Sequence, residues 1–91
     1  MASIKLVSNV NKFNIYKWLV EKLGKEEKEQ FIPSPFGGTS IREWKNGKVV
    51  LARRVSVSFV GSEMVDELVV SEEFEDLIKE IEGKVERIER N

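Results

Sequence analysis

The side chains with which this 91-residue chain could do chemistry are carboxylates, lysines and arginines, because the sequence contains neither His nor Cys. Their absence excludes a disulfide scaffold, a zinc finger, thiol chemistry and an imidazole general base. Paired carboxylates can serve as acid and base, but the acidic residues at 72–76 lie in a predicted helix among matching Lys and Arg residues. We interpret them as a solvated helix surface and predict no catalytic residue, no metal ligand and no cofactor.

Asp66 and the glycines at 37–38 are the other features that bear on an active site. Asp66 alternates with the apolar residues Met64 and Leu68, which turns its carboxylate toward the core. A strand-end or bulge position, or a nearby Arg partner, accounts for this placement better than catalysis does. The segment 36–40 lacks the Gly-Lys-Ser/Thr ending of a phosphate-binding loop. The sequence therefore favours a binding protein over a small enzyme.

The charges divide the chain into two opposed parts. Residues 1–60 carry 11 basic and 5 acidic residues, a balance of +6, whereas residues 61–91 carry 4 basic and 11 acidic residues, a balance of −7. The net charge of −1 hides this division. Such asymmetry indicates contacts with nucleic acid or with a charged protein. The alternative is that the two sets of charges cancel across the fold.

Basic residues gather around Asn46-Gly47, a dipeptide that supplies the two positive φ angles of a type I′ hairpin turn. The candidate nucleic-acid contacts are Arg42, Lys45, Lys48, Arg53 and Arg54. A two-residue turn pairs position 44 with 49, so Trp44 faces the core as a packing anchor. Arg42 and Arg53 follow the same core-side alternation. Either the hairpin extends beyond the helical layer, or a bulge at 53–54 turns one of them outward.

The periodicity predicts an α+β two-layer sandwich in the order β-α-β-β-β-α. Its mostly antiparallel four-stranded sheet carries both helices on one face, in a single domain over residues 1–91 with a flexible Pro/Gly loop at about 31–40. Asn9 or Asn11 caps the first helix, and the apolar stripe of the last helix runs to Ile88. The predicted core comprises Phe13, Tyr16, Leu19, Val20, Leu23, Val55, Val57, Phe59, Leu68, Phe74, Leu77, Ile78 and Ile81.

The other face of the predicted sheet is unusually apolar for a solvated surface. Its candidate protein-contact residues are Ile41, Val50, Val65 and Val69. A partner subunit or a second copy of the chain would cover them. Ordinary β-propensity, with Val tolerated on an exposed sheet, is the alternative reading.

The element order resembles that of small RNA- and ribosome-binding folds, including double-stranded RNA-binding domains. The resemblance is one of topology without shared signature residues, and the last helix opens on acidic Ser71-Glu72-Glu73, where those domains are basic. The Glu- and Lys-rich composition is typical of hyperthermophile proteins. We therefore expect a cytoplasmic accessory module of a thermophilic, archaeal nucleic-acid-processing complex. A structural or regulatory homodimer joined sheet to sheet is the alternative, and neither a membrane nor a small-molecule substrate is expected.

Overall fold

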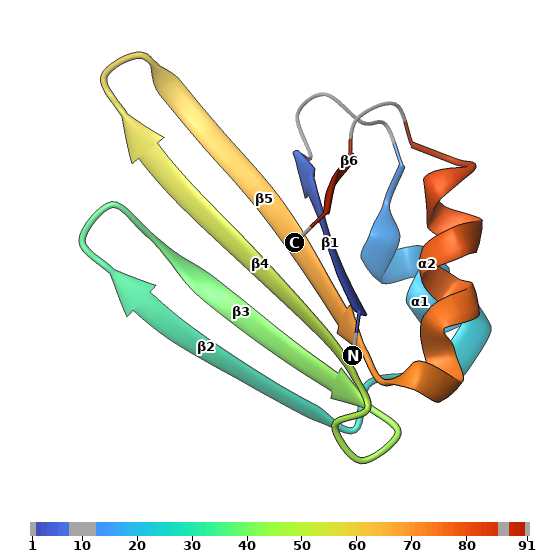
Figure 1. Ribbon diagram of the computed structural model, residues 1–91. Coiled ribbons are helices and arrows are strands. Elements are labelled where there is room, and N and C mark those ends of the chain that lie inside the picture. Colours follow the sequence, from blue (N-terminus) through green and yellow to red (C-terminus); the bar gives the residue numbers. More distant parts are fainter. Residues whose placement is uncertain (1, 8–12, 86–87, 91) are drawn as a thin grey trace.

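The computed structural model describes residues 2–7, 13–85 and 88–90. Its elements are, in chain order, β1 (Ala2–Val7), α1 (Ile15–Leu23), β2 (Lys28–Ser34), β3 (Gly37–Trp44), β4 (Val49–Ser58), β5 (Gly61–Val70), a 3₁₀ turn (Glu72–Phe74), α2 (Glu75–Glu82) and β6 (Ile88–Arg90). The strands pair antiparallel in the order β2-β3-β4-β5-β1-β6 (Figure 1). The α+β class is confirmed, but the sheet has five long strands and a short sixth, β6, in place of four.

The long strand that the sequence did not predict is β2, which with β3 forms a hairpin in place of the loop expected at 31–40. That expectation is wrong because Pro33 lies in β2, at the edge of the sheet, where a strand tolerates the missing N–H group. Gly37 opens β3 at φ 152°, and a Cβ there would collide with the Val55 carbonyl oxygen. The extra strand also means that the order underlying the resemblance to double-stranded RNA-binding domains is not the observed one.

The two other hairpins differ in how well their turns were predicted. Asn46 and Gly47 have positive φ angles of 57° and 81°, and Trp44 pairs with Val49, as the Asn-Gly dipeptide predicts. For the second hairpin, Val60-Gly61-Ser62-Glu63 predicts a turn with Gly61 at its first position, but Ser58 pairs with Gly61 and the turn falls at residues 59–60, two positions earlier. The faces of both strands are unaffected by this shift, since it is an even number of residues.

The helices are shorter than their sequence patterns predicted. Asn14 caps α1, its side-chain oxygen accepting the Lys17 N–H at 3.1 Å, whereas the predicted caps Asn9 and Asn11 lie outside the described residues. Helix α2 ends at Gly83, and the chain returns as β6, which pairs with β1. The prediction of a helical stripe as far as Ile88 is therefore wrong, since Gly disfavours continuation of a helix.

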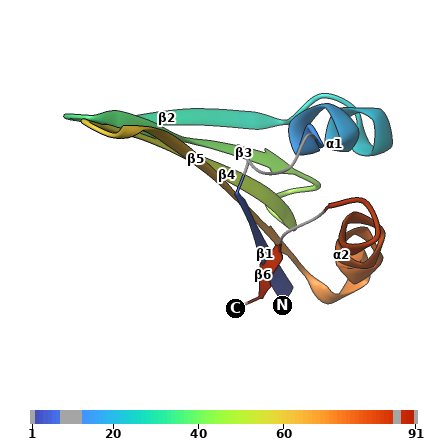
Figure 2. The same ribbon diagram turned by 90° about the horizontal axis from the view of Figure 1, so that it is seen from above.

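The core lies between the two helices and one face of the sheet, as predicted (Figure 2). Its buried side chains are Ile4, Leu6, Ile15, Trp18, Leu19, Trp44, Val49, Leu51, Leu68, Val70, Ile78 and Ile81. Trp44 is the anchor that its register indicated, only 1% exposed, and its Nε1–H donates to the Gly24 carbonyl at 2.8 Å. The core thus joins α1, both central strands and α2 at one end of the sheet.

Two predicted core residues lie far from this core. Val57 is 53% exposed and Phe59 is fully exposed, while Val55 is half-buried. The alternation of β4 correctly assigned Val55 and Val57 to the helix-facing side of the sheet, whereas Phe59 lies in the turn that follows β4. The β2–β3 and β4–β5 hairpins, however, project well past the helices that cover that side (Figure 1).

Candidate functional site

The face of the sheet opposite the helices carries the four predicted protein-contact residues. The register aligns Ile41 with Ala52 and Glu67, Val50 with Val69, and Arg54 with Val65 across neighbouring strands. We call this surface the open sheet face and define it by Ile41, Val50, Ala52, Arg54, Val65, Glu67, Val69 and, on β1, Lys5. Ile41, Val50, Val65 and Val69 are all half-buried there. Their placement on one face is as predicted, and their binding role stays a prediction.

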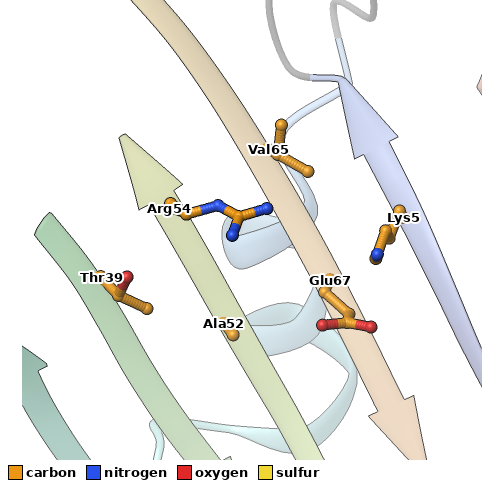
Figure 3. A pocket seen from close by; sticks show the side chains of 6 residues that line it. All are labelled: Lys5, Thr39, Ala52, Arg54, Val65 and Glu67. Carbon is orange, nitrogen blue, oxygen red and sulfur yellow. The ribbon is translucent and has the colours of Figure 1, made fainter. Parts of the chain in front are cut away.

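A shallow hollow of about 180 Å³ lies near the centre of the open sheet face (Figure 3). Its lining combines aliphatic and charged groups: Lys5, Thr39, Ala52, Arg54, Val65 and Glu67. In Figure 3 the Arg54 side chain extends from β4 toward β5, and Lys5 and Glu67 project from adjacent strands. Non-obligate interfaces are about as apolar as the rest of a protein surface and carry their polar groups at the rim, so this mixed lining is compatible with docking of a partner.

Arg53 and Asp66 form an ion pair on the helix-facing side of the sheet. Arg53 Nε donates to Asp66 Oδ1 at 2.7 Å, and its Nη2 donates to Oδ2 at 3.2 Å. The hydrogen bond to Asp66 raises the pKa of Arg53, against the opposing effect of burial. The register runs without interruption through residues 53 and 54, so the hairpin extends past the helices and no bulge intervenes. Asp66 is therefore the partner of a nearby Arg, as one of the sequence interpretations held.

Arg42 belongs to a second charged cluster, which links the β2–β3 hairpin to α1. Its Nε lies 2.9 Å from Glu26 Oε2 and 3.3 Å from Glu29 Oε2. The guanidinium also stacks 4.5 Å from the ring centre of Tyr16. The Tyr16 hydroxyl donates to Glu26 Oε1 at 3.1 Å, and that hydrogen bond is the main reason why the pKa of Tyr16 is raised. Arg42 thus has a structural role that accounts for its core-side position.

The five predicted nucleic-acid contacts do not share one surface. Arg42 and Arg53 lie on the helix-facing side, Arg54 lies on the open sheet face, and the two lysines lie in the turn at 45–48. Lys48 Nζ is 2.6 Å from Glu73 Oε1. Among the described residues, only Lys45 and Arg54 of the five have no ion-pair partner.

We expect any binding of nucleic acid to be weak and only mildly sensitive to salt. Two unpaired cations release few counterions, so log K should fall against log salt with a slope no steeper than about −2. Fluorescence anisotropy with labelled single- and double-stranded oligonucleotides measures this slope. Lys45→Glu combined with Arg54→Glu should abolish the binding, and Lys79→Glu, on the exposed side of α2, should leave it unchanged. A slope near −4.5, as about five phosphate contacts would give, contradicts the expectation.

Other kinds of site find little support in the described part of the chain. Residues 36–40 are a turn and the start of β3 rather than a phosphate loop before a helix. Within residues 2–7, 13–85 and 88–90, no three His, Cys, Asp or Glu side chains are grouped so as to hold a metal ion. No helix in those ranges has the length and apolarity needed to cross a membrane.

Sequence reasoning missed an apolar surface at the free ends of the two long hairpins. Its members are Phe31, Ile32 and Phe36 from the expected loop, Val57 and Phe59 from the predicted core, and Val60, which the strand alternation predicts on the other face of the sheet. The sequence signal that could have found them is the absence of any charged residue at 30–41 and 55–62.

Comparisons of the chain with protein-family models, with curated proteins and with solved structures found no match.

Proposed function

We propose that this chain is a small non-enzymatic module that docks onto a protein partner through its open sheet face. The observation that carries the proposal is a sheet surface with no helix over it in the described residues, on which half-buried aliphatic side chains alternate with charged ones. Lys5, Arg54 and Glu67 offer both signs of charge to a partner, which favours a specific orientation over high affinity. A cytoplasmic nucleoprotein complex of a thermophile is the setting proposed, on the composition and the charge division.

Site-specific photocrosslinking in cells of the source organism tests this proposal. A photoreactive phenylalanine analogue replaces Val50 or Val65 on the open sheet face, and Asp76 on the exposed surface of α2 serves as the matched control position. We expect one discrete adduct with another protein from Val50 and Val65, and none from Asp76. The same adducts from all three positions, or none from any, would contradict the proposal. A covalent homodimer from Val50 in the purified protein would instead favour the sheet-to-sheet homodimer.

A further inference from the structure

The free end of the sheet carries an exposed apolar surface that the fold itself does not use. We call it the distal patch and define it by Phe31, Ile32, Phe36, Val57, Phe59 and Val60. These six are the large hydrophobic side chains that stand exposed in the described part of the chain, with exposed fractions of 47% to 110%. They belong to the β2–β3 and β4–β5 hairpins, which point away from both helices (Figure 2). The exposed apolar surface of the chain is thus concentrated at one end.

Backbone pairing holds the two hairpin ends together as one surface. Gly37 pairs with Ser56 across β3 and β4, and the Val57 N–H donates to the Phe36 carbonyl at 2.7 Å. The Phe31 ring lies over Gly38, where a Cβ would collide with it. The sheet therefore fixes the shape of the patch, which wraps around the free end of the sheet: Phe31 and Val57 lie on its helix-facing side and Ile32 on its open side.

The distal patch is free of charge in a chain that is 34% charged. Residues 30–41 and 55–62 contain no Asp, Glu, Lys or Arg. Hairpin turns ordinarily take Gly, Asn, Asp, Ser or Pro, yet the β4–β5 turn presents Phe59 and Val60, both essentially fully exposed. An exposed apolar surface of this size in an otherwise polar protein marks an interaction site.

We propose that two copies of this chain form a two-fold symmetric dimer through their distal patches. The patch supplies both a protrusion and a matching hollow: Phe59 and Val60 project from the turn, and an apolar hollow of about 420 Å³ is bounded by Phe36, Val57, Ser58 and Phe59. A two-fold interface requires a surface that is complementary to itself. An uncharged patch meets this requirement without like-charge repulsion, which a charged patch facing its own copy would suffer.

The size of the patch and the charges at its rim also fit a second copy. Weighted by their exposed fractions, the five members other than Ile32 present roughly 700 Å² of surface, close to the about 800 Å² that a stable interface takes from each partner. On the open side of β4 and β5 the rim carries one charge of each sign, Arg54 and Glu63, so a second copy does not meet a rim of uniform charge. The dimer leaves the centre of the open sheet face free, so it does not depend on the proposed function.

Sedimentation velocity of the full chain over a wide concentration range tests the dimer. We expect a concentration-dependent dimer whose dissociation constant rises at least 100-fold in Phe59→Asp combined with Val60→Asp. Both residues are fully exposed in the turn, so circular dichroism should show an unchanged fold. Val50→Asp, on the open sheet face, is the matched control and should dimerise as the original chain does.

A second measurement exploits the absence of natural cysteine. Val60→Cys should form an intermolecular disulfide under mild oxidation at least tenfold faster than Asp76→Cys, which places the thiol on α2. A chain that stays monomeric at every concentration overturns the proposal, as does a dimer that is indifferent to the Phe59 and Val60 substitutions. Monomers that bind phosphatidylcholine vesicles through Phe59 would also overturn it, because the patch would then insert into lipid.

Discussion

Replacing Asp66 with Ala is expected to lower the free energy of unfolding by about 1.5–3 kcal/mol, because it removes charge-assisted hydrogen bonds and leaves a half-buried guanidinium without its carboxylate. Asp66 is 2% exposed and receives two hydrogen bonds from Arg53. No other side chain is recorded within ion-pair distance of Arg53 in the described part of the chain. Denaturant titration monitored by circular dichroism measures the loss.

Two variants separate loss of the charge pair from loss of packing at Asp66. Arg53→Met combined with Asp66→Leu removes both charges and should recover most of the stability, since an apolar pair of similar volume often equals a buried ion pair. Asp76→Ala, at an exposed position of α2, should change the stability by no more than about 0.5 kcal/mol. If the double variant is as unstable as Asp66→Ala, the unpaired charge of Arg53 does not explain the loss of stability.

Trp44→Ala is expected to cost about 3–5 kcal/mol, because it empties the largest fully buried position of the core. The indole contacts the layer formed by α1 and donates to the carbonyl of Gly24, the residue at which α1 ends. Trp44→Phe keeps most of the volume and removes the hydrogen bond, so we expect a loss of about 1–3 kcal/mol. Trp18 remains as a fluorescent reporter in both variants. Equal losses for Ala and Phe would show that packing of the ring contributes little.

Local sequence signals predicted the features that depend on neighbouring residues. Asn46-Gly47 predicted the register of β3 with β4, and the alternation of Met64, Asp66 and Leu68 placed an acidic side chain on the core side. The apolar stripe of α2 correctly identified Ile78 and Ile81 as buried. Each of these signals is contained within one hairpin or one helix.

The features that could not be predicted depend on distant parts of the chain. Pro33 fits a strand only because β2 is an edge, and the position of an edge follows from the whole sheet order. The alternation of β4 fixes the face on which Val57 lies, but not how far along that face the helices reach. The ion-pair partners of Arg42 are Glu26 and Glu29, and they likewise cannot be identified until the positions of β2 and α1 are known.

The fold brings some of the opposite charges of the two chain parts together as ion pairs. Arg53–Asp66 and Lys48–Glu73 each join a cation from residues 1–60 to a carboxylate from residues 61–91. The Arg42 cluster, by contrast, is contained within the first part. Three of the five residues predicted to contact nucleic acid are therefore already engaged in ion pairs. For this reason we favour the open sheet face over the basic residues as the binding surface.

The most direct test of the account is the affinity of the crosslinked partner for purified variants of this chain, measured by calorimetry. We predict that Val50→Asp combined with Val65→Asp weakens the complex at least tenfold, while Phe59→Asp combined with Val60→Asp leaves its dissociation constant within about twofold. The two double variants carry the same added charge on different surfaces. Loss of affinity in the Phe59 and Val60 variant alone would contradict the assignment of the partner to the open sheet face.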